Sequence, residues 1–216
     1  MADASESSSA ARLALYSLVV GVCVLALKLV AAWLTGSIAL YADALETVVN
    51  VVTAIVALLA VRLAARPADA ALPYGYGKAE YFSAVIIGVF IAVAALVIFW
   101  QAVQGFVAPR PITPDPTGIS VSVVATLVNA AWAVVLVRAG LRLRSPSLSA
   151  DGRHLFTDVV STAAVIVGVL LAILTGYHRL DSILAAFVGF AVLWTGWHVV
   201  RESVVGLMDV AVDPKT

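Results

Sequence analysis

Six long apolar stretches dominate this sequence, and their length limits the folds that are open to it. They cover approximately residues 13–34, 38–64, 81–107, 118–137, 150–174 and 181–200. Each reaches the ~20 residues that a helix needs to cross the hydrocarbon core of a bilayer. The apolar residues follow one another without alternation, which favours helices over a β-barrel. We therefore predict an all-α integral membrane protein with six transmembrane helices.

The composition agrees with this fold. Hydrophobic residues make up 62% of the chain and charged residues 12%, whereas soluble domains average about 45–50% and about 25%. The sparse Lys and Arg residues leave no surface for nucleic acid. We expect membrane lipid to surround a multi-pass protein of the cell membrane, which is the inner membrane in a Gram-negative cell.

Six spans place both chain termini on the same side of the membrane. Lys and Arg residues gather on that side, with Arg110 and Arg179 on the other side and Lys28 inside a span. This bias predicts cytoplasmic termini. The predicted divisions are a disordered cytoplasmic N-terminus at residues 1–11, a six-helix transmembrane domain at 12–205 and a short cytoplasmic tail at 206–216.

Polar side chains interrupt the second and the fifth apolar stretch in the same way. Glu46 and Asn50 are four residues apart in the second stretch, and His154 and Asp158 are four apart in the fifth. Residues with this spacing share one face of a helix. Ionisable groups at membrane depth normally face a partner or a water-filled path. Two such helices can place four ligands around one cation, and a buried hydrogen-bond network between helices is the alternative interpretation.

Other polar residues in the spans have simpler interpretations. Asp43 lies three residues before Glu46, and we expect it to support the ligands instead of binding a metal directly. Lys28 is expected to snorkel or to form an ion pair with a neighbouring helix. Asn129 is expected to hydrogen-bond between helices, as is Asp181 at a helix N-terminus.

Three stretches resemble the cation diffusion facilitator family in order and spacing: residues 35–44 (TGSIALYADA), 73–80 (PYGYGKAE) and 147–158 (SLSADGRHLFTD). The resemblance covers about residues 12–210. It implies a transporter, not an enzyme, that exports divalent metal ions from the cytosol by alternating access in exchange for protons, usually as a homodimer. It also implies that Glu46, Asn50, His154 and Asp158 hold the metal between the second and fifth spans.

The metal itself is cargo, and we expect no cofactor. His154 and Asp158 match the pattern of zinc-type members, whereas Glu46 and Asn50 stand where the family usually has Asp or His followed by Asp. Nitrogen and oxygen ligands suit Zn²⁺, and Cd²⁺ accepts similar donors, but His154 argues against Mg²⁺. We therefore expect Zn²⁺ and Cd²⁺ export, with export of Mn²⁺, Fe²⁺ or Co²⁺ as the alternative.

Two features of many family members are expected to be missing here. Histidines in the loop before the third span form a second metal site in those members. This chain has Leu72 and Tyr76 there and retains only Asp69, so we predict that the loop site is absent. Most members also continue after the sixth span into a cytoplasmic metal-binding domain. This sequence ends at Thr216, so we expect that domain to be missing from it.

Two other classes of protein have to be weighed against a transporter. An intramembrane metalloenzyme also places His and carboxylates around a metal, but no HExxH-type helix is present in the sequence. A cation channel needs a pore-lining ring or a carbonyl filter, which the sequence does not indicate either.

Overall fold

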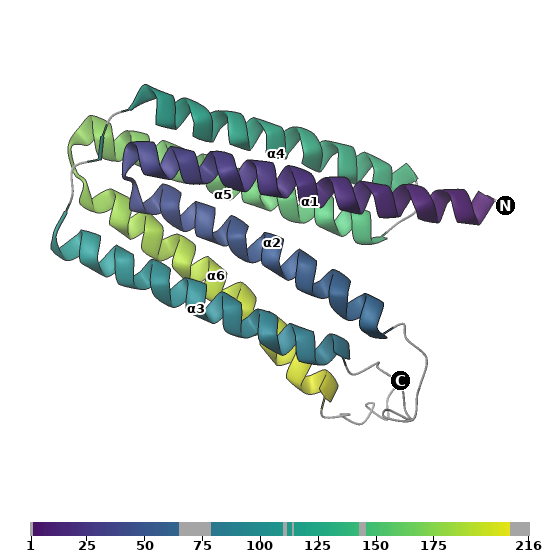
Figure 1. Ribbon diagram of the computed structural model, residues 1–216. Helices are drawn as coiled ribbons and strands as arrows, with labels where there is room; N and C mark the ends of the chain where they lie inside the picture. Colours follow the sequence, from purple (N-terminus) through teal and green to yellow (C-terminus); the bar gives the residue numbers. More distant parts are fainter. Residues whose placement is uncertain (1, 65–78, 110–111, 114, 143–145, 208–216) are drawn as a thin grey trace, which may run out of the picture.

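The computed structural model describes residues 2–64, 79–109, 112–113, 115–142 and 146–207. Within these ranges the protein consists of six helices and no strands (Figure 1): α1 (Ala2–Thr35), α2 (Ile38–Ala64), α3 (Ala79–Val107), α4 (Pro116–Arg142), α5 (Pro146–Thr175) and α6 (Arg179–Leu207). Each helix contains a stretch that is long and apolar enough to span a membrane. The predicted all-α fold with six spans is confirmed.

Glycines in the left-handed conformation end two of the helices. Gly36 (φ 67°) follows α1 and Gly176 (φ 69°) follows α5. A residue with a β-carbon rarely adopts this conformation, so glycine is the usual residue just after a helix end. Ser37 then begins α2, because its hydroxyl accepts the backbone N–H of Leu40 at 3.1 Å. Helices α1 and α5 therefore end within a residue or so of where the first and fifth apolar stretches end, at about residues 34 and 174.

The helices form two packed groups with α2 between them (Figure 1). In one group α4 packs against α5 and α1, and in the other α3 packs against α6. α2 contacts α1 on one side and α3 and α6 on the other. The first turn of α1 and the last turn of α6 lie at the same end of the bundle, as an even number of spans requires (Figure 1). The cytoplasmic position of that end stays a prediction.

Small residues allow close approach where helices cross. A β-carbon added at Gly152 of α5 would lie 2.8 Å from the backbone nitrogen of Val137 and 3.1 Å from the carbonyl oxygen of Ala133, both in α4. Such small residues are typical of contacts between transmembrane helices. Large apolar side chains instead point outward, for example Trp33 (82% exposed) and Leu96 (67% exposed). This exterior fits lipid, because a soluble protein rarely exposes so much apolar surface.

The start of α1 differs from the sequence prediction. Residues 2–11 were predicted to be disordered, but α1 already begins at Ala2. Extending an existing helix is much easier than nucleating a new one. The short polar segment therefore continues the first span as a helix.

Candidate metal site

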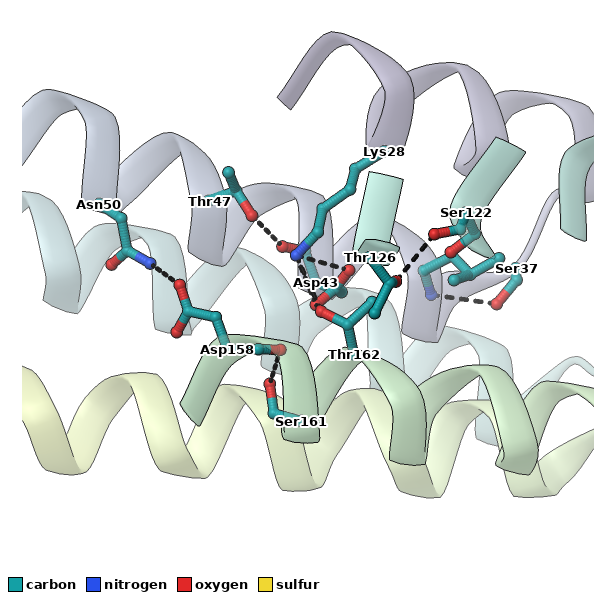
Figure 2. Close-up of polar contacts among 11 residues, drawn as sticks. Lys28, Ser37, Asp43, Thr47, Asn50, Ser122, Thr126, Asp158, Ser161 and Thr162 are labelled. Carbon is teal, nitrogen blue, oxygen red and sulfur yellow. Dashed lines mark hydrogen bonds and ion pairs between the residues drawn. The ribbon is translucent and has the colours of Figure 1, made fainter. Parts of the chain in front are cut away.

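The two predicted polar faces meet between α2 and α5. The Asn50 side-chain amide of α2 donates a hydrogen bond to Asp158 Oδ2 of α5 at 3.0 Å (Figure 2). Asp158 is 8% exposed, and both residues lie inside membrane-spanning stretches. A polar contact at such a position is costly to bury and normally marks a pathway or a binding site.

Glu46 and His154 lie near this pair without completing a cage. Glu46 is partly buried one turn before Asn50 and within electrostatic range of Asp158 and Asp43. His154 is exposed, one turn before Asp158 and within electrostatic range of it. No three His, Cys, Asp or Glu side chains come together to hold a metal ion in the part of the chain that the structure describes. Ligation by all four predicted residues therefore requires Glu46 and His154 to turn toward the Asn50–Asp158 pair.

The amide of Asn50 turns its NH₂ group toward Asp158. Only its carbonyl oxygen can bind a cation. Metal ligation by Asn50 would therefore use the other atom of the amide, and a rotation of about 180° about the last side-chain bond would bring that oxygen to the side of Asp158.

A second polar cluster lies on the next turns of the same two helices (Figure 2). Lys28 Nζ of α1 lies 3.0 Å from each carboxylate oxygen of Asp43 and donates to Thr162 Oγ1 of α5 at 2.9 Å. The Thr162 hydroxyl in turn donates to Asp43 Oδ1 at 2.8 Å. These three side chains are 1–3% exposed. Of the two interpretations for Lys28, snorkelling and an ion pair, the ion pair is confirmed, and its partner is Asp43.

Asp181 connects α6 to the beginning of α2. Its carboxylate accepts hydrogen bonds from the Ser37 hydroxyl at 2.5 Å, from Ile38 N at 2.6 Å and from Ala39 N at 3.2 Å. The first N–H groups of a helix have no partner within the helix and carry partial positive charge. The prediction that Asp181 joins helices at an N-terminus is confirmed, although the N-terminus is that of α2.

The remaining candidates are placed as follows. Asn129 is buried in α4 at 4% exposure, and its hydrogen bond between helices stays a prediction. Asp69, Leu72 and Tyr76 lie outside the described residues, so the absence of a loop site also stays a prediction. Asp151 was not among the residues predicted from the sequence, and its Oδ2 accepts a hydrogen bond from the Ser17 hydroxyl of α1 at 2.8 Å. Asp151 lies two helical turns before Asp158, and this spacing in the sequence indicates that both lie on one face of α5.

Paired polar side chains between two spans of a six-helix bundle are typical of polytopic transport proteins. Residues 14–208 match the cation efflux transmembrane domain. The chain therefore belongs to the cation efflux family, whose members are transporters and not enzymes, and it is a multi-pass membrane protein. The resemblance that the sequence motifs suggested is confirmed.

Individual relatives agree with this family. An uncharacterized transporter of Synechocystis is 46% identical over 201 residues, which are 93% of this chain and 65% of the relative. The cation-efflux pump FieF of Cronobacter sakazakii is 32% identical over 199 residues, 92% of this chain and 66% of the relative. FieF of Escherichia coli is 31% identical over 188 residues, 86% and 61% of the two chains. The chain thus spans about two thirds of the length of these relatives.

Proposed function

We propose that this protein exports divalent metal cations from the cytosol, Zn²⁺ foremost and Cd²⁺ with it, in exchange for protons. The cargo binds between α2 and α5 at Glu46, Asn50, His154 and Asp158. The observation that supports this most directly is the partly buried Asn50–Asp158 contact inside two spans. The name of the FieF relatives, cation-efflux pump, supports the direction of transport.

The chemistry of the four side chains fits a dication. One imidazole nitrogen, two carboxylates and one amide oxygen are ligand types that Zn²⁺ accepts, usually in tetrahedral arrangement. The two carboxylates neutralise the two positive charges, so the loaded site carries little net charge within the bilayer. The amide of Asn50 is a neutral and weaker ligand than a carboxylate. It lowers the affinity, which suits a carrier that has to release its cargo.

Proton exchange follows from competition for the same atoms. The metal requires neutral His154 and ionised carboxylates, so protons displace it and it displaces protons. With the termini in the cytoplasm, α5 runs outward from its first residue. His154 then lies on the cytoplasmic side of Asp158 and meets a cytosolic ion first. Alternating access in a homodimer in the cell membrane completes the proposal.

Flux measurements in proteoliposomes test the site. H154A and D158A are each expected to abolish Zn²⁺ uptake, because each removes one of four ligands, while circular dichroism and elution volume stay unchanged. T157A is the matched control, since Thr157 lies on the same turn of α5, is exposed and hydrogen-bonds only locally to the Arg153 carbonyl in this structure. Normal uptake by folded H154A protein would exclude His154 as a ligand.

The proton gradient is tested in the same vesicles. In vesicles whose lumen corresponds to the outer side, an acidic lumen is expected to speed Zn²⁺ uptake, and an ionophore that collapses the gradient is expected to slow it. Uptake that ignores the gradient at fixed membrane potential would refute proton exchange and favour a uniporter or a channel.

A second cargo class is favoured by one specific feature. Glu46 and Asn50 replace the Asp or His and the Asp that the family usually carries at these positions, which changes the charge and size of two ligands. We therefore include Mn²⁺, Fe²⁺ and Co²⁺ in the vesicle assay. A saturable rate that is highest for one of these metals would assign the protein to that cargo instead of Zn²⁺.

A further inference from the structure

Lys28 is a cation built into the membrane interior beside the candidate site. Its ammonium group, the Asp43 carboxylate and the Thr162 hydroxyl form a closed triangle in which each side chain contacts the other two. The three side chains come from α1, α2 and α5 and are 1–3% exposed. Lys28 is therefore held by two partners and shielded from water, so its charge acts on its surroundings with little screening.

The triangle borders the proposed ligands on both helices (Figure 2). Asp43 precedes Glu46 by three residues, roughly 4.5 Å along the axis of α2, and Thr162 follows Asp158 by four, roughly 6 Å along α5. The charges of Lys28 and Asp43 both act on Glu46 and on Asp158, with opposite sign. An ion bound between those two carboxylates therefore lies within reach of the Lys28 charge as well.

The number of carboxylates shows what this charge does. Asp43, Glu46 and Asp158 place three carboxylates around the α2–α5 contact, one more than the two that balance a dication when they are ionised. Lys28 contacts both oxygens of Asp43, so that carboxylate is neutralised and is not open to cargo. Two carboxylates remain for an ion with two positive charges.

We infer that Lys28 is a specificity-determining residue of the transport site. It acts as a fixed counter-charge that withholds Asp43 from the cargo and matches the charge of the site to a divalent cation. This inference rests on the proposed function, because it assigns a role at the same site. A purely structural ion pair would instead stabilise the fold without setting the affinity for metal.

Opposite shifts in metal affinity distinguish the two roles. K28M removes the positive charge and frees the Asp43 carboxylate, so Zn²⁺ should bind at least about tenfold more tightly. D43N leaves the Lys28 charge without its partner, so Zn²⁺ should bind at least about tenfold more weakly. The double variant K28M/D43N removes both charges and should return the Kd to within about threefold of wild type.

The measurement is isothermal titration of Zn²⁺ into the purified full chain in detergent at constant pH, with thermal unfolding recorded for every variant. K28Q is a second charge-removing variant that keeps a hydrogen-bond donor toward Asp43, and it replaces K28M where that protein does not fold. The double variant leaves no unpaired buried charge and is expected to fold better than either single variant.

Each outcome bears on the inference. Shifts of opposite sign that cancel in the double variant support it. Shifts of the same sign, or unchanged affinity in both single variants while D158A loses Zn²⁺ binding, overturn it and leave the proposed function standing. Zn²⁺ binding by D158A that equals wild type refutes the α2–α5 site itself, and the role of Lys28 with it.

Discussion

Replacing Asp181 by Ala is expected to destabilise the bundle far more than the loss of an ordinary helix cap. The carboxylate accepts two backbone N–H groups, those of Ile38 and Ala39, and the Ser37 hydroxyl, all from the start of α2. Asp181 is 2% exposed, so water cannot easily replace it. D181A therefore leaves these donors without their acceptor at the junction of α2 and α6, two helices that are distant in the sequence.

The magnitude can be worked from these bonds. Loss of a charged acceptor by a hydrogen-bonded donor costs about 1.5–3 kcal/mol when both groups are buried. The Ser37 hydroxyl turns easily to other partners, so the two backbone N–H groups dominate and the total is about 3–6 kcal/mol. For a chain of this length, 1 kcal/mol corresponds to about 2–4 °C in Tm, which predicts a decrease of about 6–24 °C.

Thermal unfolding in detergent, followed by tryptophan fluorescence, measures this decrease. D115A is the matched control, because Asp115 caps only its own helix: its Oδ1 accepts the Thr117 N–H at 2.8 Å at an exposed position. Its loss should lower the Tm by about 2–4 °C. D181N keeps an uncharged acceptor and should fall between the two. A D181A melting temperature within about 2 °C of D115A would refute the reasoning.

Two further substitutions test the site and the packing. N50D exchanges the amide for a charged ligand, so the affinity for Zn²⁺ in titration calorimetry should rise about tenfold or more, whereas a role in hydrogen bonding alone predicts no change. G152A forces a methyl group against the backbone of α4 and should cost about 1–3 kcal/mol in thermal unfolding. G21A is its control, since the nearest atom, Val51 Cγ2, would be 3.6 Å away, and the Tm of G21A should not fall.

The sequence was sufficient for features that depend on neighbouring residues. The apolar stretches predicted all six spans because helix length follows from bilayer thickness. The helix at residues 2–11 was not predicted, because a polar composition does not show that the adjoining helix continues through these residues.

For contacts between distant residues, the sequence predicted the type of contact but not the partner residue. An ion pair was one of two interpretations for Lys28, because a charge within a span needs a partner or a path to water. The choice of Asp43 as that partner depends on how α1, α2 and α5 cross. Asp181 was recognisable as an N-terminal residue, yet the helix that it caps was not. The spacing of His154 and Asp158 placed them on one side of α5 without showing that His154 is exposed and Asp158 buried.

The Asp181 cap has a mechanical consequence for transport. It fastens the start of α2 to α6, whereas the close contact at Gly152 fastens α5 to α4. The Lys28–Asp43–Thr162 triangle ties α2 to α1 and α5. The helix that carries Glu46 and Asn50 is thus anchored by buried polar contacts on both of its sides. Any movement of α2 relative to α5 would have to break the contacts of the triangle, whereas the Asp181 cap would keep the start of α2 against α6.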